Sequence, residues 1–500
     1  MLALLIALLA APAPQVPEQV EPSRPHLILL MTDQHRGDVL GVEGTWPVRT
    51  PHLDRIATEG LRFEHGYASV PSCTPSRAAL LTGRAPWNHG LLGYSRIPTR
   101  YPTELPRLFS DAGWQTHSIG KNHFFPQRNT HGWQTAELDE SGRVEQEGFV
   151  SDYRQWFAQA APEADPDATG IGFNDHRAGA FVLPEALHPT TWMGDRAEAF
   201  VERWDGQTPF LLKLSFARPH SPYDPPDRLL ARYADAPVPA PASGAWSDEL
   251  FGAITNESGF TAARNHLPDE TIVAARRAYC ANVEFIDEQI GRLFASLEAA
   301  DALDDCVIVF TADHGDMLGD HHLWRKTYAY EGSARIPMLV WWGERALAGR
   351  APERGQVIAT PVELRDVLPT LLDAAALPMP DDVDGGSLLS LALGDVKWRP
   401  WLDLEHATCY WPGNVWTALT DGRWKYVFHA LDGSEQLFDL EADPLEERDL
   451  AVDPEFGDQL MQWRRRMGEH LSERGPAWVD DDGLPVVRPH TILHSPNYVR

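Results

Sequence analysis

Short apolar runs alternate with helical patterns through the first two thirds of this 500-residue chain. Between the last two runs, apolar side chains recur at the spacing of an amphipathic helix, at Ile286, Ile290, Leu293 and Leu297. This alternation predicts a mainly parallel sheet with helices on both faces. The strand candidates cover residues 26–31, 117–119, 210–216 and 306–311.

Chemically active side chains follow each of these four runs. In open α/β sheets, ligands bind outside the carboxyl ends of the strands. Four separate runs that deliver polar residues to one edge therefore indicate a site there more strongly than any single residue does. The residues are Asp33 and Gln34 after the first run, Lys121 and His123 after the second, His220 after the third, and Asp313 and His314 after the fourth.

The pattern changes near residue 395. Asp421-Gly422 and Asp432-Gly433 each lie between strand-like runs, which is typical of hairpin turns. A helical stretch follows over residues 454–471. The sequence therefore predicts a small antiparallel sheet with one helix after the larger α/β part, and the chain length also favours one large domain and a smaller one.

The chain opens with an apolar run over residues 1–14 that ends in small residues. Such a run is typical of a secretory signal peptide. It is shorter than the roughly 20 apolar residues that span a bilayer, so a single N-terminal anchor is the alternative and no integral span is expected. We predict a signal peptide and linker over residues 1–24, and export to a periplasmic, extracellular or lysosome-like compartment.

Charge and cysteine usage limit the partners further. The formal net charge is −29, which disfavours nucleic acid and requires a locally basic pocket for any anionic substrate. Four cysteines are too few for a disulfide framework. Cys306 lies in an apolar run and is predicted to be buried, whereas a pairing of Cys280 with Cys409 is left open.

The run Cys73-Thr74-Pro75-Ser76-Arg77 indicates a chemical function most specifically. Thr74 is a candidate N-cap and Pro75 a candidate first residue of a helix that reaches Thr82. Free N–H groups and the positive end of the helix dipole attract an anion at such a terminus. The alternative, a structural thiol in a turn, would need neither the Pro nor the Arg.

This Cys-x-Pro-x-Arg motif resembles the core signature of the type I sulfatases, and its flanks match that family in order. The matching flanks are Thr50-Pro51-His52-Leu53-Asp54-Arg55, Gly60-Leu61-Arg62-Phe63 and Leu81-Thr82-Gly83-Arg84. The resemblance implies an alkaline-phosphatase-like fold, with a large mixed, mainly parallel sheet flanked by helices and a small C-terminal antiparallel sheet with a helix. It further implies a catalytic α/β domain over residues 25–395 and a C-terminal subdomain and tail over residues 396–500.

In that family the motif Cys is oxidised after translation to formylglycine. The resemblance therefore implies a formylglycine-generating enzyme as a maturation partner of Cys73. One hydroxyl of the aldehyde hydrate attacks sulfur, the alcohol leaves, and inorganic sulfate is released. The implied ligands of one divalent metal are Asp33, Gln34, Asp313, His314 and residue 73.

The resemblance assigns the remaining roles to five side chains. Arg77 steadies residue 73, and Lys121 holds the aldehyde hydrate or the sulfate. His123 is a base that helps to release sulfate, and His220 lies beside the leaving oxygen. Lys326 contacts the sulfate and can donate a proton.

The metal pairs Asp33-Gln34 and Asp313-His314 depart from the Asp-Asp and Asp-Asn pairs of many sulfatases. The segment from Asp313 to His322 is closer to choline-sulfatase-like enzymes and to phosphonate monoester hydrolases of the same superfamily. Calcium prefers oxygen ligands, whereas a His ligand admits manganese more readily. Ca²⁺ is therefore the predicted metal, with Mn²⁺ or Mg²⁺ as alternatives.

We predict an enzyme that hydrolyses a sulfate monoester of a sulfated carbohydrate or of a small aryl or alkyl alcohol. One alternative is a phosphonate monoester or phosphodiester hydrolase with the same nucleophile. In such relatives neutral hydroxyl residues replace the element that is intact here as Gly120-Lys121-Asn122-His123. A second alternative is a non-catalytic binder of sulfated glycans. The identity of the alcohol, exo or endo action and the oligomeric state are left open.

Overall fold

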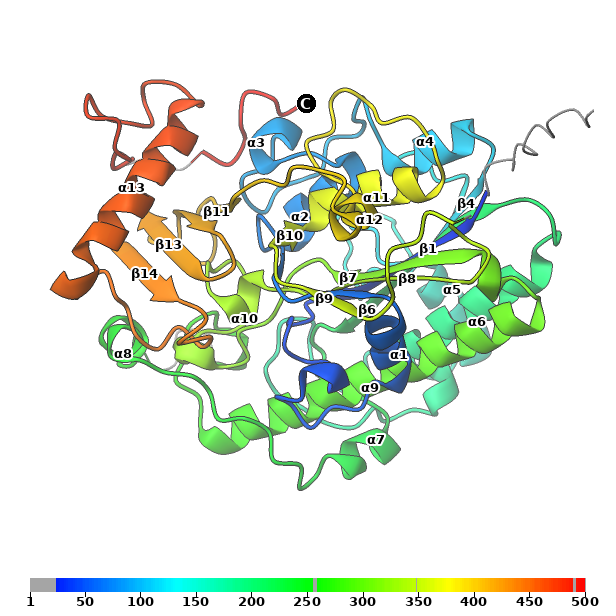
Figure 1. Ribbon diagram of the computed structural model, residues 1–500. Coiled ribbons are helices and arrows are strands. Elements are labelled where there is room, and N and C mark those ends of the chain that lie inside the picture. Colours follow the sequence, from blue (N-terminus) through cyan, green and yellow to red (C-terminus); the bar gives the residue numbers. More distant parts are fainter. Residues whose placement is uncertain (1–23, 255–258, 348, 489–491, 500) are drawn as a thin grey trace, which may run out of the picture.

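An eight-stranded sheet forms the centre of the molecule (Figure 1). The structure is a computed structural model that describes residues 24–254, 259–347, 349–488 and 492–499. In spatial order the strands are β5 (Thr135–Leu138), β4 (Gln115–Gly120), β6 (Phe210–Pro219), β1 (His26–Asp33), β7 (Cys306–Ala312), β8 (Met338–Trp342), β2 (Leu61–Phe63) and β9 (Gln356–Ile358). All neighbours pair in parallel except β8, which is antiparallel to β7 and to β2. The predicted mixed, mainly parallel sheet is confirmed.

The four strands predicted from sequence are β1, β4, β6 and β7, and they lie side by side. β1 continues to Asp33, two residues beyond its predicted end, and β6 continues to Pro219. Asp33 is therefore the last residue of a buried strand rather than the first residue of a loop. Its backbone position is fixed by pairing with β6.

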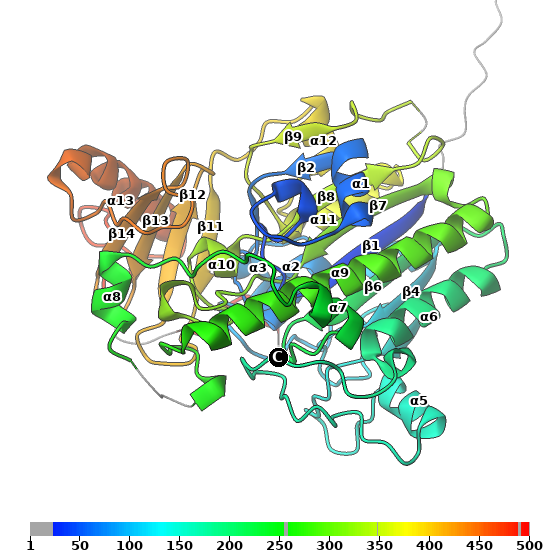
Figure 2. The same cartoon turned by 90° about the horizontal axis from the view of Figure 1, so that it is seen from below.

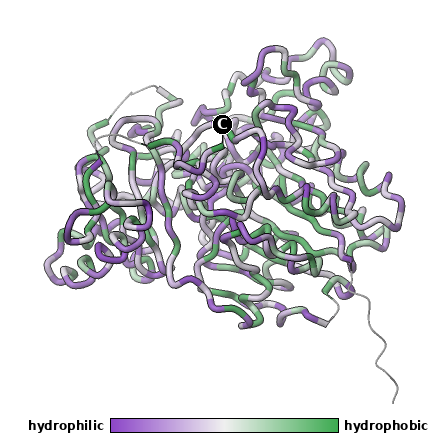
Figure 3. Tube along the Cα trace, turned by 90° about the horizontal axis from the view of Figure 1, so that it is seen from above, coloured by the Kyte–Doolittle hydropathy of each residue, from purple (hydrophilic) through white to green (hydrophobic). Residues whose placement is uncertain are grey.

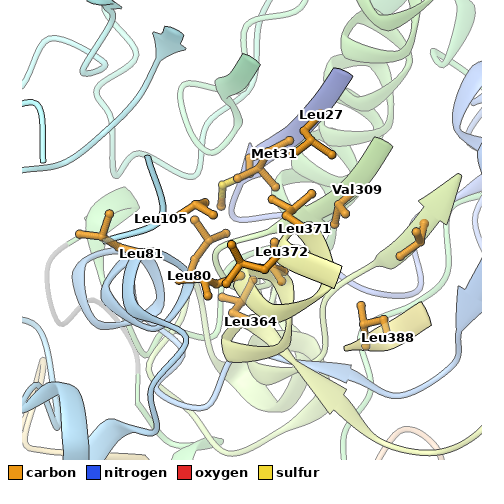
Figure 4. Close-up of a cluster of buried hydrophobic side chains, with 14 of the residues drawn as sticks. Leu27, Met31, Leu80, Leu81, Leu105, Val309, Leu364, Leu371, Leu372 and Leu388 are labelled. Carbon is orange, nitrogen blue, oxygen red and sulfur yellow. The ribbon is translucent and has the colours of Figure 1, made fainter. Parts of the chain in front are cut away.

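Side chains of β1 alternate between two cores, as the two-residue period of a strand requires. Leu27, Leu29 and Met31 pack beneath α2 (Cys73–Thr82), α4 (Leu105–Asp111), α11 (Val367–Ala374) and α12 (Leu388–Leu393) (Figure 4). Ile28 and Leu30 face α1 (Pro51–Glu59), α5 (Asp152–Ala160), α6 (Pro189–Arg203) and α9 (Asp269–Ala299) (Figure 2). The strands lie between the two helical layers, and hydrophobic residues gather along them (Figure 3).

A second sheet lies at one end of the molecule and is antiparallel throughout (Figure 1). Its strands, in order, are β11 (Leu402–His406), β12 (Trp416–Thr420), β13 (Trp424–His429) and β14 (Glu435–Asp439). One face buries Trp463, Met467 and Leu471 of α13 (Gly457–Ser472). The other face packs on Tyr328 and Tyr330 of the larger part. This is the predicted sheet with one helix, although residues 454–456 form a separate short turn of 3₁₀ helix before α13.

Short elements complete the described chain. They are β3 (Gly66–Tyr67), β10 (Val362–Glu363), α3 (Pro86–His89), α7 (Asp227–Arg232), α8 (Ala245–Phe251) and α10 (Glu331–Ala334). All four cysteines are free thiols, so Cys280 and Cys409 are unpaired, and Cys306 is buried as predicted. Among the residues that the structure describes, no helix is both long and apolar enough to cross a bilayer. The predicted signal peptide falls almost wholly on residues 1–23, outside the described residues.

The core beneath α9 makes a stability prediction. Ile290 is fully buried there, so Ile290→Ala removes apolar contacts and leaves a cavity. We expect the free energy of unfolding to fall by about 2–5 kcal/mol in urea denaturation. The control Val452→Ala, at a position 81% exposed, should leave the midpoint unchanged. Equal effects of the two substitutions would contradict this assignment of the core.

Candidate active site

The residues predicted from four separate strands meet at the carboxyl edge of the large sheet, beside the first turn of α2. Ligand atoms of Asp33, Cys73, Asp313 and His314 all lie within 4.8 Å of one another and are buried. The Nζ atom of Lys326 lies 3.2 Å from the Cys73 Sγ atom, and that of Lys121 lies 3.6 Å from it. Lys121 also forms an ion pair with Asp33.

The helix that carries Cys73 begins earlier than predicted. Cys73 is its first residue, Ser72 is the N-cap, and Thr74 lies inside the first turn. The prediction of Thr74 as N-cap was wrong because the Ser76 N–H already donates to the Ser72 carbonyl, which extends the helix backwards. Pro75 is tolerated because N–H groups of a first turn have no partner within the helix. Cys73 still lies at a helix N-terminus, as expected.

The donor set at the centre of the site suits a divalent cation. The His314 Nε2 atom lies 3.2 Å from Cys73 Sγ, 3.6 Å from Asp33 Oδ1 and 3.5 Å from Asp313 Oδ1. Two buried carboxylates this close to each other need positive charge between them. The two carboxylates match the preference of Ca²⁺ for oxygen ligands, and the imidazole nitrogen admits Mn²⁺ more readily. The described residues thus form a possible metal-binding group.

Gln34 is held in an orientation that directs its amide oxygen toward this cluster. Its Nε2 donates to Asp316 Oδ2 at 2.6 Å, and its Oε1 accepts from Lys326 Nζ at 3.1 Å. Its backbone has a positive φ of 67°, a conformation that non-glycine residues rarely adopt. The Gln34 N–H donates to Asp313, and its carbonyl accepts from the Tyr279 hydroxyl at 2.5 Å. These contacts maintain a strained turn at a functional position.

Asp316 and Tyr279 hold Gln34 in place, and sequence reasoning missed both. Asp316 accepts from Gln34, from the Tyr223 hydroxyl at 2.7 Å, and from the N–H groups of Leu318 and Arg325. Its position three residues after Asp313 was the available signal. Tyr279 lies on α9, far from any motif, and no sequence pattern distinguished it.

Opposing charges determine the electrostatics of the site. Burial by itself would raise the pKa of the Cys73 thiol, but Lys121 and Lys326 lower it well below its usual range. Burial would likewise raise the pKa of Asp33, but nearby positive charges lower it well below its usual range, and Lys121 has the largest effect among them. For His220, burial and then Lys326 lower the pKa well below its ordinary value. The site therefore favours anions at position 73 and an uncharged imidazole at position 220.

Arg77 bonds to Asp313 and to two further groups beside the cluster. Its Nε donates to Asp313 Oδ2 at 2.9 Å, and its Nη1 donates to the Lys121 carbonyl at 2.7 Å and to Ser215 Oγ at 3.2 Å. These bonds orient Asp313 and the start of the segment that carries Lys121. Arg77 thus holds Asp313, a neighbour of residue 73, and the expected role of steadying residue 73 itself stays a prediction.

Two of the predicted histidines contact the segment that contains Arg143 and Glu145. His123 Nε2 lies 3.0 Å from Glu145 Oε1 and 3.2 Å from the Tyr94 hydroxyl. His220 Nδ1 lies 2.8 Å from the Ser221 carbonyl, and its Nε2 lies 3.3 Å from Arg143 Nη2. Sequence reasoning missed Arg143 and Glu145, which lie in a segment without a motif.

Comparisons with known proteins agree with this geometry. A family model described as Sulfatase matches residues 25–377, and one described as N-sulphoglucosamine sulphohydrolase, C-terminal, matches residues 319–473. The chain therefore belongs to the sulfatase family, whose members are sulfuric ester hydrolases of the alkaline phosphatase superfamily.

Individual relatives cover almost the whole chain. An arylsulfatase of Clostridium perfringens is 34% identical over 92% of this chain and 97% of its own length. A choline-sulfatase of Rhizobium meliloti is 31% identical over 86% of this chain and 83% of its own length. A phosphonate monoester hydrolase of Silicibacter pomeroyi has the same fold, with a TM-score of 0.74, 24% identity, and coverage of 93% of this chain and all of that one.

The contacts of Asp316 generate a prediction. Asp316→Asn keeps the shape but turns an amide NH₂ group toward two of the four donors. We expect the free energy of unfolding to fall by about 1.5–3 kcal/mol in urea, because bonds to a buried carboxylate are lost. The turn at Gln34 loosens as well, so kcat/KM should fall. The matched control is Asp481→Asn at an exposed position, and a stability loss as large in this control would contradict the role of Asp316.

Proposed function

We propose that this protein hydrolyses sulfate monoesters at Cys73 after its conversion to formylglycine, with one divalent cation held by Asp33, Gln34, Asp313 and His314. A single observation supports this most strongly. The Sγ atom of Cys73 lies within 4 Å of two lysine ammonium groups and of His314, at a buried helix N-terminus. A structural thiol would need none of these neighbours.

The formylglycine hydrate would supply the nucleophile, and the cation would supply Lewis-acid stabilisation of the sulfuryl group. Lys121 and Lys326 offset the negative charge that the sulfuryl oxygens carry in the transition state. Arg77 keeps Asp313 in position through its bond to Oδ2. These groups are buried, so little reorganisation is needed when the charge develops.

Two side chains transfer protons in this proposal, and a third orients the leaving group. Lys326 can protonate the leaving oxygen, since it is a cation beside residue 73. His220 is uncharged, and its Nδ1 proton is committed to the Ser221 carbonyl, so it orients the leaving group. His123 is paired with Glu145, which holds the imidazole as a base for the release of sulfate.

The substrate is a sulfated carbohydrate or a small aryl or alkyl sulfate, in keeping with relatives named arylsulfatase and choline-sulfatase. The second candidate is phosphonate monoester or phosphodiester hydrolysis, which the fold of the phosphonate monoester hydrolase favours. Lys121 and His123 lie at the site and favour sulfate. We further propose that the metal is Ca²⁺, that the protein is exported after its leader is cleaved, and that a domain boundary lies near residue 395.

Maturation gives the first test. Co-expression with a formylglycine-generating enzyme should convert Cys73 into an aldehyde, which peptide mass spectrometry detects. Arg77→Lys and Pro75→Ala variants, which alter the motif, should be converted less. A fully active preparation that retains an unmodified thiol at position 73 would rule out this nucleophile.

The metal ligands give the second test. Asp33→Ala or Asp313→Ala should abolish turnover and remove the stabilisation that added cation gives in thermal unfolding, because the remaining carboxylate cannot hold the ion alone. Chelation of the unsubstituted enzyme should have the same effect. Near-normal turnover and cation binding by Asp313→Ala would show that the ligand assignment is wrong.

Discrimination between sulfate and phosphate gives the third test. We expect kcat/KM for an aryl sulfate to exceed that for the matching phenylphosphonate ester or phosphodiester by at least ~100-fold, about 2.7 kcal/mol of transition-state preference. Lys121→Ala should reduce that preference. Equal efficiency on the phosphodiester, with Cys73 fully converted, would favour the second candidate.

A further inference from the structure

Arg143 is a half-buried cation that the proposed chemistry does not use. Its Nη2 lies 3.3 Å from His220 Nε2, and its Nη1 is buried without a hydrogen-bond partner. An unpaired guanidinium nitrogen in a buried position is costly unless a ligand completes it. Burial by itself would lower the pKa of Arg143, but the negative charges of Cys73 and Asp33 raise it. The guanidinium thus lies within the field of the reaction centre.

The surroundings of Arg143 restrain both its backbone and its side chain. Its backbone N–H donates to the Glu140 carbonyl at 3.0 Å, and its backbone carbonyl accepts from Gln127 Nε2 at 3.1 Å. The guanidinium lies over the ring of Phe173, with its carbon 4.8 Å from the ring centroid. Stacking of this kind restricts the guanidinium without using its N–H donors. Arg143 is therefore held in place with its Nη1 nitrogen still unpartnered.

A cavity of about 350 Å³ lies beside Arg143 and is lined by Gly142, by Phe173 beneath the guanidinium, and by Pro222. Two arginines line this cavity, but each already has a carboxylate partner. Arg218 binds Asp224, and Arg154 binds Asp167. Arg143 differs from these two arginines, because its guanidinium contacts His220 and has a buried nitrogen without a hydrogen-bond partner.

The scissile sulfate does not need Arg143. Lys121 and Lys326 lie near residue 73, whereas Arg143 lies against His220, the residue proposed to face the leaving oxygen. We infer that Arg143 binds a second acidic group, a carboxylate or another sulfate, carried by the alcohol part of the substrate. Planar, bidentate binding of such groups is the chemistry to which a guanidinium is best suited. This inference rests on the proposed sulfatase function.

Matched substrate pairs test it in the matured, metal-loaded enzyme. We would measure kcat/KM for phenyl sulfate and for the three isomers of carboxyphenyl sulfate, and for glucosamine 6-O-sulfate and glucosamine 2-N,6-O-disulfate. In at least one pair or isomer, the doubly acidic substrate should be preferred by at least ~10-fold. Arg143→Gln should remove that preference, and Arg143→Lys should keep part of it.

The control is Arg177→Gln, which removes an exposed arginine that pairs with Asp175. It should leave the preference intact. Thermal unfolding establishes that each variant is folded. If Arg143→Gln does not fold, Arg143→Lys still allows the test.

If Arg143 serves only to position His220, its loss would lower kcat on every substrate equally and leave the preference unchanged, which would overturn the inference. Absence of any preference in the unsubstituted enzyme would overturn it as well. Hydrolysis of none of these sulfate esters would instead refute the proposed function itself.

Discussion

The balance of buried charge around Cys73 is the constraint on which the rest of the structure depends. Two carboxylates and a thiol of lowered pKa lie within a few ångströms of one another, away from water. Such a group is stable only beside fixed positive charge. Lys121, Lys326 and Arg77 supply it from three separate segments. In the proposed mechanism Lys121 and Lys326 would also bind the sulfuryl oxygens, so these two cations would serve both folding and catalysis.

The parallel sheet makes this arrangement possible. β1, β4, β6 and β7 end at one edge, and each delivers a charged or imidazole side chain there. The helix α2 adds Cys73 from the side. α9 contributes Tyr279, whose hydroxyl accepts from the Arg36 N–H and donates to the Gln34 carbonyl. Asp316 then fixes the Gln34 amide. The strained turn at Gln34 is stable because contacts from these distant segments determine it together.

The sequence predicted the strands that carry the site, because buried strands leave apolar runs and motif residues follow them directly. It also predicted the residues that meet at the centre. It did not predict the antiparallel β8, because an apolar run carries no information about strand direction. It did not predict Arg143, Glu145 and Tyr279, because their contacts form only when distant segments fold together. The predicted start of α2 was wrong because Pro75 was assumed to be the first helical residue. A proline is tolerated throughout the first turn, and Pro75 is the third residue of the helix.

An anomalous difference map from crystals of the matured enzyme, grown with its native metal, would test the central claim most directly. The account predicts one strong peak at coordination distance, about 2.0–2.6 Å, from oxygens of Asp33 and Asp313 and from the Gln34 or His314 side chain. In the refined structure Lys121 and Lys326 should remain beside residue 73. A fully active enzyme with no peak between these ligands, or with its metal bound elsewhere, would contradict the account.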